Sequence, residues 1–273
     1  MKIVVPIAGR GSRFKIVADS NPEYLRPKPI IDIKGKPMVR WAIESLPFVD
    51  LPDRHVNTQF RVSVSDLIFI CLQEHNDKFG IVSVLKKYFS PKIKIILIPE
   101  ITRGAVETAM AAEQYIDPDQ DLIISDSDHY FDGTNLYKTI LSAKQNVAGI
   151  IPVFKPSNND PKWSYTLFDD NYSALAVGEK DVELANRGAY ANIGGYYFSK
   201  AKMFLEEAKM MISHNEMYGA KEKQEFYVAP LYQRLIKKNM KIKVALIPRV
   251  WGLGTPQDLD FFLKDFNFNT SSG

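Results

Sequence analysis

The stretch Ala8–Phe14, A-G-R-G-S-R-F, together with the P-K-P at Pro27–Pro29, decides the fold of this chain. It follows a short apolar run, Lys2–Ile7, which predicts a first β-strand, and a mixed loop is expected to lead on to the P-K-P. A glycine-rich turn that leaves a strand lets backbone N–H groups approach an anion without interference from Cβ atoms. Arg13 in the turn and Lys28, stiffened by its flanking prolines, add positive charge. Glycines for close approach and two cations indicate a site for a polyphosphate.

Two better-known glycine-rich motifs do not fit this stretch. A dinucleotide fingerprint needs a third glycine or an alanine at the position where this chain has Phe14. A P-loop needs Gly-Lys followed by Ser or Thr after a four-residue spacer, and the sequence contains no such string. The stretch therefore predicts a polyphosphate site of a different kind.

The composition is that of a globular protein with ample length for a core. The chain has 273 residues, 45% of them hydrophobic and 25% charged, and a formal net charge of +3. This charge is too small to favour nucleic acid as a partner. Residues 1–40, however, hold nine Lys or Arg against three Asp or Glu. Basic charge concentrated around the glycine-rich turn suits a small phosphorylated ligand.

The cysteine content and the N-terminus favour a cytoplasmic location. Cys71 is the single cysteine and lies in the apolar run Leu67–Leu72, which predicts a buried thiol and no disulfide framework. The first apolar run is too short for a signal peptide and leads into Arg10 and Arg13. No segment approaches membrane-spanning length, so no membrane partner is expected. The tail after Phe268 is expected to be disordered or an addition to the natural chain.

The first part of the chain alternates apolar runs of strand length with amphipathic segments of helix length. This alternation predicts a mainly parallel sheet with helices on both faces. Asp50–Ser65, with prolines and mixed polar residues, is expected to be an insertion before the second strand. Strands are expected at Lys2–Ile7, Asp66–Leu72, Ile93–Ile98, Asp121–Ser125 and Val147–Val153, and helices at Pro37–Leu46, Asn76–Tyr88, Ala105–Tyr115 and Leu136–Lys144.

From about residue 160 the pattern predicts a more antiparallel part. We expect one domain over residues 1–268, with a nucleotide-binding half at about 1–155, an acceptor-binding half at about 156–268 and a tail at 269–273. Ligands of such folds bind beyond the carboxyl ends of the strands, where the glycine-rich turn lies. In this part strands are expected at Trp163–Phe168, Ser173–Val177, Ala191–Phe198 and Ile242–Ile247, and helices at Lys200–Ile212, near Phe226–Lys238 and from Pro256.

With these motifs the chain resembles the sugar-phosphate nucleotidylyltransferases, which make nucleotide-sugars and related activated alcohols. The most specific similarity is A-G-R-G-S-R together with P-K-P-I-I-D-I-K-G-K-P-M, and the resemblance extends from Lys2 to about Phe262. These enzymes join a nucleoside triphosphate (NTP) to a phosphomonoester and release pyrophosphate. The resemblance implies an α/β fold of three α/β/α layers, Rossmann-like and similar to glycosyltransferase-A enzymes, with a mainly parallel mixed sheet and a small antiparallel acceptor-binding part. It also implies a role in nucleotide-sugar biosynthesis, as for polysaccharide or capsule.

By this resemblance the glycine-rich turn would hold the triphosphate, and Lys28 would approach the reacting phosphates. The residues implied around the triphosphate are Ala8, Gly9, Gly11, Ser12 and Arg13.

The stretch Ile98–Ala105 resembles the base-reading turn of the family, with Glu100, Gly104 and Ala105 as candidate contacts. A carboxylate only accepts hydrogen bonds, so Glu100 suits a base edge rich in N–H donors, such as that of cytosine or guanine. This favours CTP or GTP as the nucleotide. The alternative is that Glu100 is an exposed loop residue without a ligand.

The segment Ile123–Phe131, I-I-S-D-S-D-H-Y-F, resembles the strand end at which the family binds Mg²⁺. Asp128 would match the metal-binding carboxylate, because Mg²⁺ takes hard oxygen ligands beside phosphate oxygens. Asp126, two residues earlier on the same strand face, is a second candidate ligand. The alternative is that both simply end a strand. His129 is interpreted as a neighbour and not a ligand, because His or Cys partners at ligand spacing are missing.

One departure from the family concerns the metal. Many relatives carry an aspartate two residues before the closing Gly-Thr pair, where this chain has Gly252. Asp258 is not a simple replacement, because Thr255-Pro256-Gln257-Asp258 predicts a helix start with Thr255 as its cap. The number of metal ions therefore stays open.

Three further elements resemble the acceptor site of the family. Glu179 of G-E-K would contact the acceptor, and Lys180 would contact the acceptor's phosphate. Aromatic residues of this region are expected either to face a sugar ring or a quaternary ammonium, or to pack in the core. The other implied pocket residues are Asn192, Gly194, Tyr196 and Glu225, and the aromatic residues are Trp163, Tyr165 and Tyr196; Pro230 stands near where many relatives carry an aspartate.

The predicted reaction is an in-line attack of the acceptor's phosphate oxygen on the α-phosphorus of the NTP. A phosphomonoester has a second pKa near ~6 and is already largely anionic, so no general base is needed. The reaction instead needs alignment and suppressed repulsion between anions, for which Arg13, Lys28, Lys180 and an Mg²⁺ on Asp128 are the candidates.

Other functions remain open at this point. A phosphocholine-type or other alcohol-phosphate cytidylyltransferase would use the same phosphate site with another acceptor. A glycosyltransferase could use Asp126-Ser127-Asp128 to hold Mn²⁺ and a nucleotide-sugar. Against this, the diphosphate of a nucleotide-sugar would not need the charges of both Arg13 and Lys28. Gly252 suggests a non-catalytic nucleotide-binding subunit. The sequence also leaves open whether copies of the chain form a homo-oligomer.

Overall fold

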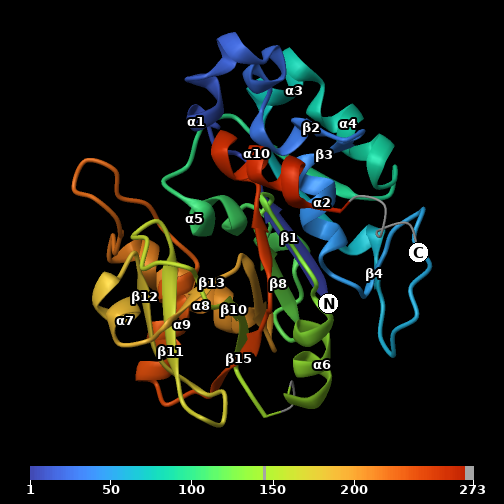
Figure 1. Cartoon of the computed structure of the whole chain (residues 1–273). Coiled ribbons are helices and arrows are strands. Elements are labelled where there is room, and N and C mark those ends of the chain that lie inside the picture. The colour runs from blue at the N-terminus through green and yellow to red at the C-terminus, as the bar shows by residue number, and fades with distance from the viewer. Residues whose placement is uncertain (144–145, 268–273) are drawn as a thin grey trace.

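A computed structural model describes residues 1–143 and 146–267, and one mixed sheet runs through both halves of this region (Figure 1). Its strands lie in the order β12-β11-β13-β10-β14-β8-β1-β6-β7, and β15 also pairs with β10. The strands are β1 (Lys2–Pro6), β6 (Leu67–Leu72), β7 (Lys94–Ile98), β8 (Leu122–Ser125), β10 (Gly149–Phe154), β11 (Ser164–Phe168), β12 (Ala174–Glu179), β13 (Tyr190–Asn192), β14 (Gly195–Phe198) and β15 (Ile242–Leu246).

Pairing differs between the two halves of the sheet. The neighbours β8, β1, β6 and β7 are parallel, as the alternation of strands and helices predicted. Strand β14 joins them antiparallel through β8, and the pairs β10–β13, β11–β13 and β11–β12 are antiparallel too. The parallel half therefore carries the glycine-rich turn, and the antiparallel half carries the predicted acceptor elements.

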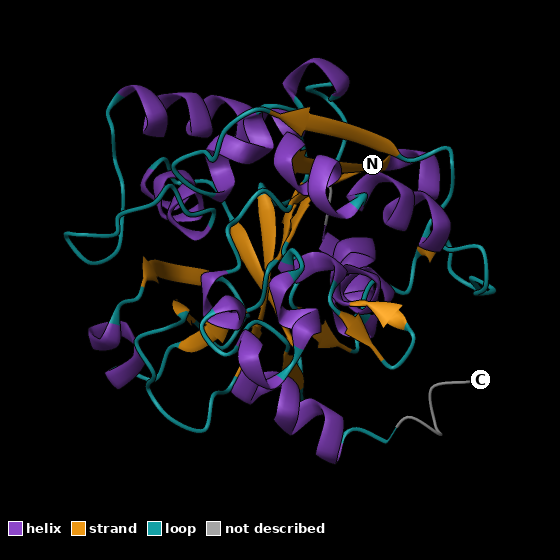
Figure 2. Cartoon of the chain, turned by 90° about the horizontal axis from the view of Figure 1, so that it is seen from above, coloured by secondary structure: helices purple, strands orange, loops and turns teal. Residues whose placement is uncertain are grey.

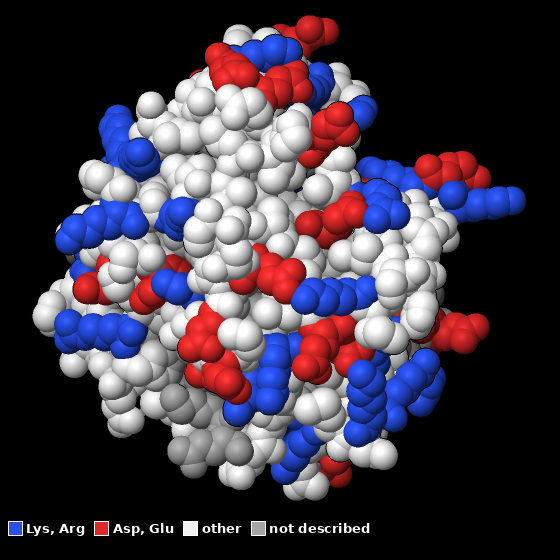
Figure 3. Space-filling model, turned by 180° about the vertical axis from the view of Figure 1, so that it is seen from behind, with Lys and Arg blue, Asp and Glu red and all other residues white. Residues whose placement is uncertain are grey.

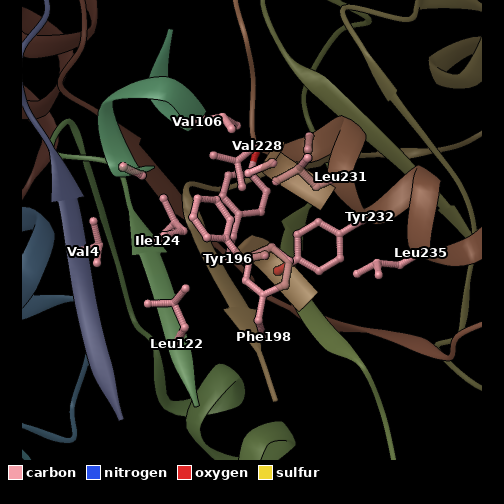
Figure 4. Close-up of a cluster of buried hydrophobic side chains, with 14 of the residues drawn as sticks. Val4, Val106, Leu122, Ile124, Tyr196, Phe198, Val228, Leu231, Tyr232 and Leu235 are labelled. Carbon is pink, nitrogen blue, oxygen red and sulfur yellow. The ribbon is translucent and has the colours of Figure 1, made fainter. Parts of the chain in front are cut away.

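Helices cover both faces of the parallel strands and give the predicted three layers (Figure 2). Along β1, Val4 packs on one side while Ile3 and Val5 pack on the other, because successive strand side chains point to opposite faces. Figure 4 shows the core on the Val4 side, where β1, β8 and β14 meet α5 and α9. On the Val4 side lie α5 (Ala105–Met110), α8 (Ala201–Ser213) and α9 (Ala229–Lys237); on the other lie α2 (Met38–Glu44), α4 (Ile81–Tyr88) and α6 (Thr134–Ala143).

Glycines divide two elements that the sequence predicted as continuous. The predicted helix Asn76–Tyr88 is two helices, α3 (Gln73–Phe79) and α4, because Gly80 lies between them in a left-handed conformation with φ 62°. The predicted strand Ala191–Phe198 is two strands, β13 and β14, separated by Ile193 and Gly194. There the Gly194 carbonyl accepts a hydrogen bond from the Asp126 N–H at 2.9 Å, so the break joins this strand to the end of β8.

The predicted helix Ala105–Tyr115 is also shorter than expected. Helix α5 ends at Met110, and a 3₁₀ turn, η5 (Glu113–Tyr115), follows it. The amides of Ala111 and Ala112 bond to carbonyls three residues earlier, so the chain tightens at this point.

The C-terminal elements pack against the N-terminal loop, as Figure 1 shows for α10 (Pro256–Asp265) beside α2. A buried aromatic cluster joins them and contains Phe14, Trp41, Trp251 and Phe262. The loop predicted after Phe14 contains short helical turns, α1 (Ser12–Lys15), η1 (Ala18–Ser20), η2 (Pro22–Leu25) and η3 (Lys28–Ile30); the other short elements are β2 (Asp32–Ile33), β3 (Lys36–Pro37), β4 (Val49–Asp50), β5 (Val62–Ser63), η4 (Val64–Asp66), β9 (His129–Phe131), α7 (Val182–Asn186) and β16 (Val250–Gly252).

Three other expectations have direct outcomes. Cys71 is fully buried, as predicted. Between β4 and β5 the chain forms no helix or strand, in agreement with the expected insertion. The predicted helix end at Lys144 and the tail at 269–273 lie outside the described residues. Among the residues that are described, none of the helices combines the length and apolar character needed to cross a bilayer.

Candidate active site

The glycine-rich turn and the Asp126–Asp128 segment meet at one edge of the sheet. Strands β1 and β8 are parallel neighbours, with Lys2 opposite Leu122 and Val4 opposite Ile124. The carboxyl ends of parallel neighbours lie side by side, so the turn after β1 and the segment after β8 are brought together.

An ion pair joins these two segments across 100 positions of the chain. The Lys28 ammonium donates to Asp128 Oδ2 at 2.7 Å, and both side chains are mostly buried. Gly11 lies beside Lys28 in a left-handed conformation with φ 64°, which favours glycine at this position, while a Cβ there would make only an ordinary contact of 3.4 Å with Lys28 Cβ. Two residues that the sequence singled out separately are therefore direct partners.

Burial and neighbouring charges move the pKa values of the two aspartates in opposite directions. Burial alone would raise the pKa of Asp128, but the charges of Lys28, His129 and Arg13 outweigh it and hold this pKa well below its usual range. Burial and the Asp128 charge raise the pKa of Asp126. Asp126 and Asp128 therefore need a nearby cation for both carboxylates to be ionised at the same time.

Glycines make room for both carboxylates. A Cβ on Gly254 would lie 2.5 Å from Asp128 Oδ2, and one on Gly194 would lie 2.0 Å from Asp126 Oδ2. The Leu253 amide also donates to the Asp128 carbonyl at 2.8 Å. Sequence reasoning missed Gly254, although the closing G-L-G-T that contains it was a visible signal.

The residues around Asp128 fit a divalent metal ion. Asp126, Asp128 and His129 each offer a ligand atom, and these atoms lie within 4.8 Å of one another. Two carboxylates are the kind of hard oxygen donor that Mg²⁺ takes beside phosphate oxygens. His129 Nδ1 lies 3.3 Å from Asp128 Oδ1 and has no hydrogen-bond partner among the described residues. The interpretation of His129 as a neighbour rather than a ligand stays a prediction.

Asp258 is a helix-start residue, as predicted. Thr255 caps α10, its hydroxyl accepting from the Asp258 amide at 3.1 Å, and Pro256 follows in the first turn. The Asp258 carboxylate accepts from the Thr255 hydroxyl at 2.7 Å and lies 3.5 Å from Lys162 Nζ. Asp258 is not part of the Asp126, Asp128 and His129 group, but its carboxylate lies beside Gly252, with its Cγ 3.2 Å from where a Gly252 Cβ would be.

The glycine-rich turn leaves space and positive charge open to solvent. A Cβ on Gly9 would meet no atom within 4 Å, and its φ is not left-handed, so nothing in the described chain demands a glycine there. Ser12 and Arg13 are exposed at the start of α1, while Ala8 is buried. Arg13 has no hydrogen-bond or ion-pair partner among the described residues, yet its charge contributes to the low pKa of Asp128.

The predicted base-reading turn is hydrogen-bonded to the segment around Phe226. Gly104 has φ 141°, and a Cβ on it would lie 2.5 Å from the Phe226 amide nitrogen, so packing alone explains this glycine. The Phe226 amide donates to the Arg103 carbonyl at 2.8 Å, and the Val106 amide donates to the Phe226 carbonyl at 3.0 Å. Ala105 begins α5 half-buried, and Glu100 is exposed without a partner among the described residues.

A buried polar cluster lies in the acceptor half. Ser164 hydrogen-bonds Glu179, and Thr166 donates to Asn192 Oδ1 at 2.6 Å. Burial, with the Asp126 and Glu225 charges, raises the pKa of Glu179 to about 7. Sequence reasoning missed Ser164 and Thr166, although polar residues alternating along one strand face were the available signal.

The cluster also contains a side-chain donor without a hydrogen bond, on Asn192, and a tyrosine with a shifted pKa, Tyr196. Asn192 Nδ2 is buried without a hydrogen-bond partner among the described residues, and a buried donor of this kind normally has one. Burial, together with the Asp126 and Glu179 charges, raises the pKa of Tyr196 well above its usual range. Tyr196 therefore lies near both the metal-ligating group and Glu179.

Lys180 is the cation of the acceptor half. Its ammonium donates to the Tyr227 hydroxyl at 2.6 Å, and burial and the Glu225 charge raise the pKa of Tyr227. Lys180 also has φ 56°, which is uncommon for a residue other than glycine and is frequent at functional positions. Tyr227, which belongs with Glu225 to the predicted pocket element E-F-Y, is thus the partner of Lys180.

The aromatic residues divide between core and site. Tyr165 is fully buried against Leu184 and Ala185, so it packs in the core. Trp163 is half-buried, with its ring centroid 5.8 Å from that of His129. Trp163 is therefore the aromatic residue that links the acceptor half to the metal-ligating group.

Comparison with known proteins gives both sequence and structural relatives. The sequence profile of the nucleotidyl transferase family matches residues 24–232. The bifunctional protein GlmU of Methanocaldococcus jannaschii is 26% identical over 260 residues, which cover 95% of this chain but 52% of that protein. The chain thus spans about half the length of this curated relative.

Solved structures with related folds cover nearly the whole chain. The nucleoside-diphosphate-sugar pyrophosphorylase of Vibrio cholerae RC9 superposes with a TM-score of 0.72 at 21% identity, over 96% of this chain and 99% of that one. The inositol-1-phosphate CTP transferase of T. maritima gives 0.64 at 14% identity, over 97% and 96%. HddC of Yersinia pseudotuberculosis, complexed with GMP-PN, gives 0.61 at 19% identity, over 97% and 99%.

Proposed function

The chain belongs to the nucleotidyl transferase family, and from this premise we propose that it joins an NTP to a phosphorylated sugar or alcohol. The products are a nucleoside-diphosphate-activated compound and pyrophosphate. The observation that carries the proposal is the Lys28–Asp128 ion pair of 2.7 Å, which lies between the glycine-rich turn and the acceptor half. This pair supports the proposal because it joins a candidate phosphate-binding cation to a candidate metal-binding carboxylate.

The glycine-rich turn is proposed to bind the triphosphate. The open space beside Gly9 lets phosphate oxygens approach the backbone N–H groups of Ala8–Ser12. Arg13, free of protein partners among the described residues, is available to a phosphate oxygen, and Lys28 is proposed to move its ammonium from Asp128 to the reacting phosphates. Charge developed in the transition state would then be neutralised by Arg13 and Lys28.

Asp128 and Asp126 would hold Mg²⁺. When bound, the ion supplies charge neutralisation and alignment of phosphate oxygens. The ion also relieves the repulsion that raises the pKa of Asp126, because both carboxylates then face a cation. The acceptor phosphate needs no general base, since it is already anionic at neutral pH.

The acceptor is proposed to lie against Glu179, Asn192 and Tyr196, with its phosphate on Lys180. Buried amide, hydroxyl and carboxylate groups suit the hydroxyl groups of a sugar or polyol, and the unpartnered Asn192 Nδ2 is a donor for one of them. Gly194 and Glu225 belong to the same wall, Gly194 beside Asp126 and Glu225 beside Tyr227. In this proposal the acceptor phosphate faces the Asp126–Asp128 segment.

The nucleotide is proposed to be CTP or GTP. Glu100 is exposed and unpartnered among the described residues, so its carboxylate is available to N–H donors on a base, and Gly104 and Ala105 adjoin it. Glu100 favours, as a second candidate function, an alcohol-phosphate cytidylyltransferase. On the face shown in Figure 3, Lys and Arg alternate with Asp and Glu, so this face has no continuous basic patch of the kind that binds nucleic acid. A cytoplasmic role in nucleotide-sugar biosynthesis for polysaccharide or capsule completes the proposal.

The test is a matrix of the four NTPs against a panel of sugar 1-phosphates, polyol phosphates and phosphocholine, read by pyrophosphate release. We expect release that depends on one NTP, one acceptor class and added Mg²⁺. Release of a nucleoside diphosphate from a nucleotide-sugar would instead identify a glycosyltransferase. NTP binding without turnover for any acceptor would identify a non-catalytic subunit.

A further inference from the structure

A second pocket lies on the other side of the glycine-rich turn. It has a volume of about 180 Å³ and is lined from the turn by Arg10 and Lys15, from α3 by His75, and from the loop after β7 by Ile101. Arg10 belongs to the glycine-rich turn and Ile101 to the predicted base-reading turn Ile98–Ala105, but neither side chain is assigned above to the NTP or to the acceptor.

The charges that line this pocket are mainly positive. Arg10 and Lys15 are exposed, and neither has a hydrogen-bond or ion-pair partner among the described residues. The acidic lining residue, Glu74, is exposed and forms an ion pair with Lys78 at 2.5 Å. Arg10 and Lys15 outnumber Glu74 among the lining residues, so the net charge of the lining is positive and favours an anion.

A buried polar group faces the same pocket. His75 is only 5% exposed, and its Nδ1 has no hydrogen-bond partner among the described residues. Burial and, to a lesser extent, the nearby charge of Lys15 lower the pKa of His75. The ring is therefore neutral, and one of its nitrogens can donate a hydrogen bond. Apolar side chains of Leu72 and Phe79 form the remaining wall and leave room for a small organic group.

We propose that this pocket binds the phosphate group of a small metabolite through Arg10, Lys15 and His75, and that its occupation strengthens NTP binding. Arg10 stands between Gly9 and Gly11, so an anion held by its side chain fixes the backbone that is proposed to cradle the triphosphate. A ligand that orders this turn removes part of the entropy cost of binding the second ligand. The linkage is reciprocal, so NTP binding strengthens phosphate binding by the same factor. This inference adds a regulatory site to the proposed function.

The test uses inorganic phosphate as the probe and the ring signals of the four histidines as the readout in nuclear magnetic resonance. His75→Gln assigns the His75 signals. We expect saturable shifts of these signals in the wild type, weakened about fivefold or more in Lys15→Ala, as for loss of one charged contact. Lys86→Ala, which removes an exposed cation on α4 outside the pocket, should leave the titration unchanged. With a non-hydrolysable NTP analogue present, phosphate should bind more tightly.

Several outcomes would overturn the proposal. Shifts confined to His129 would mean that phosphate binds only in the active site. Displacement of phosphate from His75 by the analogue would mean that the pocket is part of the NTP site, and equal phosphate affinity with and without the analogue would remove the coupling. Pyrophosphate release without added phosphate tests the proposed function separately, so the two can fail independently.

Discussion

The two sides of the active site use different chemistry. On the nucleotide side, the full charges of Arg13, Lys28, Asp126 and Asp128 come together beyond the ends of β1 and β8. Arg13 is exposed, and the Lys28–Asp128 pair is mostly buried. On the acceptor side, neutral hydroxyl and amide groups of β11 and β13 surround one buried carboxylate, Glu179, and the charge of Lys180 is held by a phenol.

This difference follows from what each side has to recognise. A triphosphate carries charge whatever its base or acceptor, so cations and a metal-binding carboxylate can be common to many enzymes of one fold. One acceptor differs from another in its hydroxyl groups. Buried polar groups of the protein discriminate strongly between acceptors, because an acceptor that lacks the matching hydroxyl leaves them without a hydrogen bond. We therefore expect substitutions on the nucleotide side to lower turnover generally, and substitutions on the acceptor side to change acceptor affinity.

The largest effect is expected for Asp128→Asn. Loss of the metal-binding carboxylate should lower turnover by roughly 10²–10³-fold, as for loss of one electrostatic stabiliser of the transition state. The matched control is Asp170→Asn, an exposed carboxylate without a partner among the described residues, which should keep wild-type turnover. Near-normal pyrophosphate release by Asp128→Asn would refute the metal assignment.

A smaller and more selective effect is expected for Lys180→Met. Loss of the cation for the acceptor phosphate should lower kcat/KM for the acceptor by roughly 10–100-fold, while KM for the NTP stays unchanged. Tyr227→Phe, which removes only the hydroxyl that positions Lys180, should have a weaker effect of the same kind. Lys221→Met, at an exposed site, is the control. An equal loss of affinity for both substrates would contradict the division into two sides.

Gly9→Ala probes the space above the glycine-rich turn. A Cβ at this position meets no protein atom, so stability should be unchanged, but NTP affinity should fall by about tenfold because the methyl group occupies the approach of a phosphate, equivalent to about 1.4 kcal/mol. Gly11→Ala serves as contrast, because φ 64° should cost about 1 kcal/mol of stability as well. Unchanged NTP affinity in Gly9→Ala would show that the triphosphate binds elsewhere.

The carboxyl of Glu179 is expected to make the free energy of unfolding depend on pH. The pKa of its carboxyl is about 7 in the folded chain against 4.5 ordinarily, so folding favours the protonated form. Relative to Glu179→Gln, the free energy of unfolding of the wild type should therefore fall as pH rises from about 4.5 to about 7, by about 2–3 kcal/mol in total. Denaturant titrations of both proteins between pH 4 and pH 8 measure this. A constant difference between the proteins would contradict the buried environment of Glu179.

The sequence predicted the charged side of the site well, for a physical reason. Alternating apolar runs place the ends of β1 and β8 together, so Lys28 and Asp128 could be assigned to one place although 100 positions separate them. The motifs on these strand ends are short and contiguous, which makes them visible in one dimension.

The acceptor side was less accessible to prediction. Ser164 meets Glu179 because β11 pairs antiparallel with β12, and Thr166 meets Asn192 because β11 pairs antiparallel with β13. Tyr227 reaches Lys180 from a more distant segment, and such pairings leave little local signal. Gly80 and Gly194 likewise divide elements that hydrophobic pattern alone joins into one. In both places the hydrophobic pattern correctly predicted a helix or a strand, but it did not predict that the element is divided in two.

The most direct test of the central claim follows two labels with the substrate pair selected by the pyrophosphate assay. With NTP labelled with ³²P at the α-phosphate, the account predicts that the label moves to the activated acceptor; with NTP labelled at the γ-phosphate, it predicts that the label leaves in pyrophosphate. Transfer of the γ-label to the acceptor, or retention of the α-label in free nucleotide, would contradict attack on the α-phosphorus at this site.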